Sequence, residues 1–177
     1  MMVSRISPVG IDVPIIQLQT YLYEGLSFGN WESHDRAYTT EAENGLRAEI
    51  YTRKGEYEEI FFNDTFDCTS FFIVNPIVDY NEPSYLASQE ASLIFQVKLN
   101  KVFPNVAHRA DEEFRNAIIE RLKTYPAGLI LNSTETGIRN VYREFEQGRI
   151  KYTDMSDFHV LRLNFDINYD STCCEEC

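Results

Sequence analysis

Histidine and cysteine are the residues of this 177-residue chain that most readily act as bases, nucleophiles or metal ligands. The three histidines, His34, His108 and His159, stand far apart, and none belongs to an HExxH pair or has another ligand at zinc spacing. Cys68 would be the nucleophile of any cysteine–histidine pair, but it lies in a predicted strand, where a free cysteine is usually a small buried apolar residue. We therefore expect neither a histidine metal site nor a catalytic thiol.

The other three cysteines, Cys173, Cys174 and Cys177, lie in the acidic segment 171–177. A CxxC spacing is half of a zinc site, and exposed thiols can also form disulfides between subunits in air. No second ligand pair is present, so the favoured interpretation is a flexible tail with incidental thiols, and a metal would need ligands from another chain. The pattern is no disulfide framework of a secreted protein.

Acidic residues are numerous, but their spacing has structural explanations. Asp111, Glu112 and Glu113 fill the first turn of a predicted helix, where the helix dipole favours carboxylates. A catalytic site would have to be assembled from scattered carboxylates, and nothing in the sequence places them together: Asp67, Glu90 and Asp166. A glycine-rich phosphate loop and a GxSxG motif are both missing from the sequence. We predict no enzyme, with no catalytic, cofactor-binding or metal-ligating residues.

Composition favours a folded acidic protein that does not grip nucleic acid. The chain is 44% hydrophobic and 14% aromatic, which supplies a core and excludes disorder of the whole chain. A formal charge of −12 repels phosphate, so we do not expect sequence-specific binding of DNA or RNA. The sequence contains no signal peptide and no stretch of about twenty apolar residues, so we expect a cytoplasm-like compartment and no membrane.

The elements that would position these residues begin with a helix over residues 13–26. Asp12 is a plausible N-cap, Pro14 suits the first turn, and leucine and isoleucine recur at helical spacing. Trp31 and His34 follow in a predicted loop. A hairpin is expected next, with strands over 46–51 and 57–62 around Lys54-Gly55.

Two further strands are predicted over 66–74 and 88–99, separated by a polar loop at 79–83. A second helix is expected over 109–124, and a short strand over 129–131. Thr134 is a candidate cap of a short helical insert, and alternation over 161–169 predicts a last strand with one apolar and one wet face.

This order of elements predicts an α+β fold: a mainly antiparallel sheet of about four to six strands, with two main helices on one face and a short helical insert. We expect a single domain over residues 1–170, followed by the cysteine-containing tail 171–177.

Two segments carry a resemblance to a known family. Residues 10–26 (GIDVPIIQLQTYLYEGL) look like the opening helix of tailed-bacteriophage neck proteins, and residues 91–113, a strand that leads into a helix, are similar to their C-terminal half. With the β-meander between them, the chain resembles the tail-terminator and tail-completion family of the head–tail junction. The segment 133–157 and the cysteine tail depart from that pattern.

The resemblance implies a structural subunit of the virion, assembled in the host cytoplasm into a homo-oligomeric ring of six or twelve copies. Such a ring would contact portal, connector and tail proteins and leave a passage for double-stranded DNA without binding it specifically. The alternative is a small non-enzymatic binding or assembly module outside a virion, because a fold alone does not fix a function.

Overall fold

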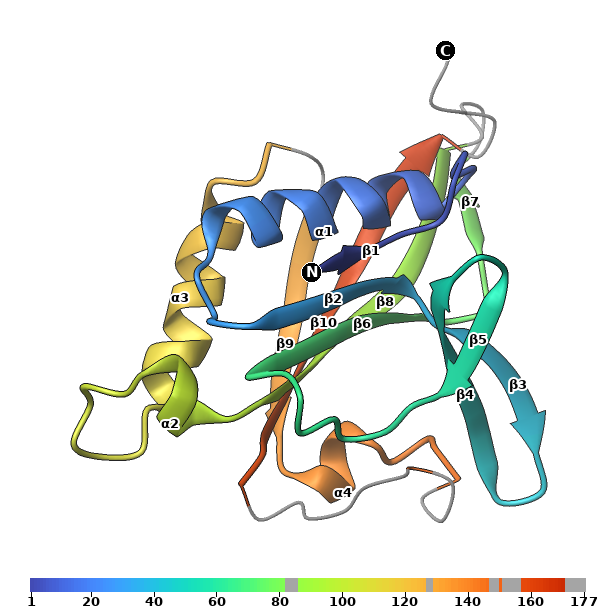
Figure 1. The fold of residues 1–177 in the computed structure, drawn as a ribbon. Coiled ribbons are helices and arrows are strands. Elements are labelled where there is room, and N and C mark those ends of the chain that lie inside the picture. Colours follow the sequence, from blue (N-terminus) through green and yellow to red (C-terminus); the bar gives the residue numbers. More distant parts are fainter. Residues whose placement is uncertain (82–85, 127–128, 147–149, 151–156, 171–177) are drawn as a thin grey trace.

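The computed structural model of the chain describes residues 1–81, 86–126, 129–146, 150 and 157–170 (Figure 1). In chain order the described elements are β1 (Met2–Val3), α1 (Asp12–Gly25), β2 (Trp31–Arg36), β3 (Tyr38–Ala42), β4 (Gly45–Arg53), β5 (Glu56–Glu59), β6 (Cys68–Val74), β7 (Asp79–Asn81), β8 (Leu86–Val97), α2 (Leu99–Val102), α3 (Asp111–Lys123), β9 (Leu129–Thr136), α4 (Ile138–Val141) and β10 (His159–Asp170). The predicted tail 171–177, with its three cysteines, lies outside these described residues.

The chain folds as α+β around a seven-stranded mixed sheet in the order β1-β2-β6-β8-β10-β9, with β7 paired to the start of β8. Strands β1, β2 and β6 run parallel to one another, whereas β6, β8, β10 and β9 alternate in direction. The prediction of four to six mainly antiparallel strands was therefore wrong at one edge. Parallel neighbours need a long crossover connection, and residues 37–67 supply it between β2 and β6.

Both long helices pack on one face of this sheet, as predicted (Figure 1). Helix α1 buries residues spaced by three and four positions, so one stripe of its surface faces the strands. Helix α3 does the same with Phe114, Ile118 and Leu122. Each of these buried side chains contributes roughly 1.5–3 kcal/mol of apolar transfer free energy. This core also takes in the buried aromatic residues Phe28, Trp31 and Phe95.

A second, antiparallel sheet, β3-β4-β5, covers the other face together with α4. The predicted hairpin is thus confirmed, but it belongs to this separate sheet, which we call the arm (residues 38–59). Ala48 and Ile50 of β4 pack against Ile73, Ile94 and Val160 of the main sheet in a second core. Two covered faces explain why β6 is buried along its whole length.

Strand β2 occupies the segment that the sequence predicts as a loop. Five of its six residues, WESHDR, are polar, so the segment lacks the apolar alternation that marks a strand. Hydrogen bonds take the place of apolar contacts there. The Trp31 indole N–H donates to Ser70 Oγ at 3.0 Å, and Ser70 Oγ lies 3.1 Å from Ser33 Oγ. His34 Nδ1 lies 3.0 Å from the Tyr51 carbonyl oxygen.

Four local predictions were also wrong. Thr134 lies inside β9, and α4 begins instead after Gly137, whose φ of +83° suits glycine. Asp12 is the first residue of α1 and its carboxylate binds arginines rather than capping the helix. Residues 79–81 form the short strand β7. The supposedly wet face of β10 is covered at Arg162, which is 5% exposed.

Candidate functional site

The three carboxylates considered for an enzyme do not converge. Glu90 and Asp166 are direct partners in the β8–β10 ladder, so two of the three are neighbours. Asp67 lies beside the opposite end of β8, where its backbone oxygen accepts a hydrogen bond from Lys98 N–H. Val97 lies seven positions after Glu90 along the extended strand, which corresponds to about 23 Å. The Asp67 carboxylate is used locally and accepts from Asn30 N–H at 2.8 Å.

Cys68 and His159 also fail to form a catalytic pair. Both residues are register partners of Val97, on opposite sides of β8, so one whole strand lies between them. Two strand spacings put their Cα atoms roughly 10 Å apart. Cys68 is fully buried, and burial raises the pKa of its thiol well above the ordinary value, which keeps it protonated and unreactive.

The other histidines hold structural contacts. Buried His34 of β2 has its Nε2 3.2 Å from a Glu32 carboxylate oxygen. Exposed His108 pairs with Glu113 at 2.7 Å. Among the described residues, His, Cys, Asp and Glu side chains form no group of three or more that could hold a metal ion.

A polar groove of about 550 Å³ lies between the arm and the β8–β10–β9 part of the main sheet. Its walls include Thr40 and Glu41 of the arm, and Ser92, Asn164 and Arg162 of the main sheet. The groove is therefore a junction between two sheets that belong to one chain.

Arg162 holds the floor of this groove with hydrogen bonds from all three of its guanidinium nitrogens. Its Nε donates to Ser92 Oγ at 3.0 Å and to Asn164 Oδ1 at 2.8 Å. One Nη donates to the Val141 carbonyl at 3.3 Å, and the other to Glu144 at 3.2 Å. A buried guanidinium that is hydrogen-bonded through all three nitrogens stabilises one geometry, and it keeps few donors for a ligand.

A second ion pair extends this network toward the solvent. Glu135 of β9 accepts from Arg143 at 2.5 Å and from the Asn164 amide at 2.6 Å. The Arg143 guanidinium also lies 3.6 Å from Glu144. The network thus ties β9, β10 and the segment after α4 together. Its groups are mutually neutralised, which is an arrangement for holding elements rather than for moving protons.

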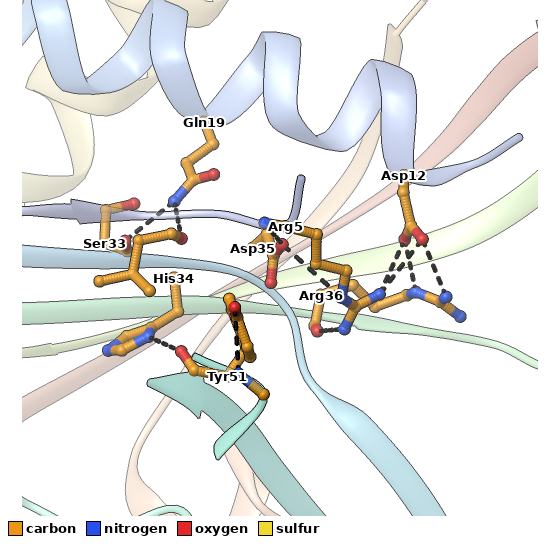
Figure 2. A network of polar contacts seen from close by, with 10 residues as sticks. Arg5, Asp12, Gln19, Ser33, His34, Asp35, Arg36 and Tyr51 are labelled. Carbon is orange, nitrogen blue, oxygen red and sulfur yellow. Dashed lines mark hydrogen bonds and ion pairs between the residues drawn. The ribbon is translucent and has the colours of Figure 1, made fainter. Parts of the chain in front are cut away.

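The second polar cluster lies at the opposite edge of the sheet, between β1, β2 and α1 (Figure 2). Asp12 accepts from both Arg5 and Arg36, with Arg36 Nε at 2.7 Å and Arg5 Nη1 at 3.2 Å. The backbone N–H of Arg5 donates to Asp35 Oδ2 at 2.7 Å. Burial raises the pKa of the Asp35 carboxyl above its ordinary value, and the Arg5 guanidinium opposes that rise.

Gln19 links the same three elements from within α1. It is 1% exposed, and its amide nitrogen donates to the Val3 carbonyl at 3.0 Å and to the Ser33 carbonyl at 2.9 Å (Figure 2). Sequence analysis missed both polar clusters, because Arg5, Arg36 and Arg162 stand far apart in the sequence. A glutamine within an apolar helical stripe was the one available signal, since a buried amide requires partners.

Among the described residues, strand β9 pairs on one side only, with β10, so it forms one edge of the main sheet. From Leu129 to Thr134 it carries no charged side chain, and Ile130 is 56% exposed. Natural proteins usually protect an exposed edge strand with charges, proline or very short length. The one charged residue of β9, Glu135, lies near the end of the strand, and the register shifts between Asn164 and Phe165 of the neighbouring strand.

Comparison with known protein families finds no family model that matches this sequence, and the curated proteins contain no match either. None of the helices in the described parts of the chain is long and apolar enough to cross a membrane.

Proposed function

We propose that this chain is a structural subunit that assembles with copies of itself into a ring. We further propose that the ring belongs to the neck or tail junction of a tailed bacteriophage. There it would join portal-side proteins to the tail and leave a passage for DNA. The subunit would be assembled in the host cytoplasm and become part of the virion.

The observation that carries the assembly proposal is the open edge of β9. In the described part of the chain β9 pairs only with β10, and an eight-residue edge strand with an exposed isoleucine is a ready partner for another strand. Both faces of the main sheet are already covered within the chain, so its edges are the surfaces left for pairing. A contact between different surfaces of two copies forms a ring where the rotation from one copy to the next closes.

The bacteriophage part of the proposal is supported by resemblance and by layout. The segment 10–26 that resembles the opening helix of neck proteins is α1, and the segment 91–113 runs from β8 into α3. These two helices share one face of the sheet. The net charge of −12 suits a wall past which DNA slides without binding.

The decisive experiment is electron microscopy and native mass measurement of the purified full-length protein, with an edge variant. We expect closed particles of six or twelve copies. Ile130→Lys should shift these particles to monomers, because a charge on an edge strand opposes pairing. The matched control is Ile77→Lys, since Ile77 is 66% exposed but lies outside β9. A wild-type protein that stays monomeric at all concentrations would overturn the ring.

A second candidate, a non-enzymatic binding module, is favoured by the polar groove. Its volume of about 550 Å³ would admit a peptide segment. The same mass measurement separates the two functions: a stable monomer that gains one partner per copy supports the module, whereas a closed homo-oligomer supports the ring.

A further inference from the structure

The N-terminal segment, residues 2–5, binds at the edge of the main sheet through specific contacts with β2 and α1. We call this binding site on β2 and α1 the seat. Met2 and Val3 pair in parallel register with Ser33 and His34 of β2. The Val3 side chain is 2% exposed, and its carbonyl accepts from the Gln19 amide at 3.0 Å. The seat therefore recognises both the backbone and one apolar side chain of this segment.

Arg5 closes the seat with charge. Its backbone N–H binds Asp35, its guanidinium binds Asp12 at 3.2 Å, and a further N–H donates to the Arg36 carbonyl (Figure 2). Every acceptor in this set lies on β2 or at the start of α1. The seat thus belongs to the body of the molecule, and it would accept the same segment from any copy that presents it.

The linker between the seated segment and α1 is held in an unfavourable conformation. Ser7 has a φ of +56°, in the left-handed region that non-glycine residues rarely adopt. It directly precedes Pro8, and the residue before a proline prefers an extended backbone. On the same linker Ile6 is 89% exposed and Val9 is 61% exposed. Opening the linker would relieve the backbone strain at Ser7 and allow these apolar side chains to be covered.

We propose that residues 2–5 are exchanged between neighbouring copies, so that each copy seats the N-terminal segment of the next. An extended linker of five residues, 6–10, spans about 17 Å, which is enough to reach an adjacent body. The contacts at the seat are the same in the exchanged and the closed arrangement, while the strain at Ser7 exists only in the closed one. Exchange of an identical segment is a low-cost route to association, and short strained linkers promote it.

This inference rests in part on the proposed function, because exchange in one direction around a ring gives each copy one donor and one acceptor role. It differs from that proposal in naming the segment, its seat and its partner, which is a second copy of this chain. The partner surface is the β2 edge and the start of α1, far along the strand order from β9.

The test uses cysteines placed at register partners on separate chains. Full-length protein with Cys173, Cys174 and Cys177 changed to serine is the background, and Cys68 remains because it is fully buried. Chains with Met2→Cys are co-expressed with chains with Ser33→Cys and then oxidised. Parallel register partners have a Cα separation within the range of a disulfide. We expect a covalent two-chain product on a non-reducing gel.

Two controls define the background and the mechanism. Met2→Cys chains mixed with Ile77→Cys chains measure random collision, because Ile77 is exposed and is not a partner of β1. Ser7→Gly removes the strain of the closed linker, so the two-chain product should fall several-fold. The adjacent register pair, Val3→Cys with His34→Cys, is tested in parallel in case one bond cannot form.

The exchange is overturned if chains carrying both cysteines link internally while mixed single-cysteine chains give no more product than the collision control. Native mass measurement of the same samples reports the ring separately. A ring without the two-chain product would remove the exchange and leave the proposed function. A two-chain product without a ring would support the exchange and remove the proposed ring.

Discussion

At the scale of single residues, His159 shows how burial decides a protonation state. Its ring lies at the start of β10, 6% exposed, with Nδ1 3.0 Å from Arg109 Nη2. A guanidinium can only donate, so Nδ1 must be an unprotonated acceptor. Burial, with a contribution from the Arg109 charge, lowers the pKa of His159 below the ordinary 6.5. The folded state therefore requires a neutral imidazole.

This lowered pKa predicts a loss of stability in mild acid. Because the unfolded chain binds a proton at His159 more readily than the folded chain, the free energy of unfolding should fall as the pH drops below about 6.5. A single proton contributes a slope of at most about 1.4 kcal/mol per pH unit. The free energy of unfolding is measured with urea from about pH 5 to about pH 7, a range that includes the ordinary histidine pKa of about 6.5. Over this range it should change less steeply with pH for His159→Asn than for the wild type.

His108→Asn is the matched control for this measurement, because the His108 side chain is 71% exposed. Its pH slope should equal that of the wild type. An unchanged slope in His159→Asn would show that His159 does not carry the acid sensitivity.

At the scale of single residues, the buried polar contacts were not predictable from the sequence. Arg162 lies in a stretch of β10 that alternates regularly, so it was assigned to the solvent face. The pattern contains no information about the arm and α4, which cover that face through contacts from distant segments. Buried polar residues of this kind depend on tertiary partners, and a single sequence does not display them.

At the scale of elements, the side-chain amide of Gln19 joins β1, β2 and α1 through two hydrogen bonds. Replacing Gln19 by leucine removes both of its hydrogen bonds and leaves the carbonyl oxygens of Val3 and Ser33 without that donor. We expect the free energy of unfolding to fall by roughly 2–3 kcal/mol, because buried groups that lose partners bear a desolvation cost. Hydrogen exchange of the backbone amides around β1 should also become faster.

Gln17→Leu is the control for Gln19→Leu, since Gln17 lies on the exposed side of the same helix. Such a surface change should alter stability by no more than about 0.5 kcal/mol. Equal effects of the two substitutions on stability and on exchange would contradict the role given to Gln19.

The long elements were predictable because local pattern and burial agree in them. Helix α1 lies within one residue of the predicted 13–26, and the antiparallel pair β8 and β10 matches its alternating residues. Strand β2 was not predictable in the same way, because its polar residues are buried by hydrogen bonds to β6 and the arm. Strand β2 pairs in parallel with β1 and with β6, so the parallel edge of the sheet could not be predicted without it.

At the scale of the whole molecule, the net charge of −12 opposes the association that the open edge favours. Salt screens this repulsion, since the Debye length falls from about 30 Å at 0.01 M to about 8 Å at 0.15 M. We expect the oligomer to form at several-fold lower protein concentration at the higher salt. Sedimentation velocity across this salt range would measure the shift.

A variant with less negative charge tests the same balance from the other side. Glu56→Gln with Glu58→Gln removes two exposed charges from the arm, and the double variant should assemble at lower salt than the wild type. Dissociation of the wild-type oligomer on adding salt would instead show that attractive ion pairs hold the interface.

Trp31 has a practical consequence of a different kind, because it is the only tryptophan in the chain. Its indole is 3% exposed and is surrounded by the rings of Tyr23, Phe28 and Phe95 at centroid distances between 5.1 and 5.9 Å. The molecule therefore carries its own optical reporter, deep in the helix-covered core and away from the β9 edge. Its fluorescence should change when that interior unfolds and should stay constant when folded copies associate through the β9 edge.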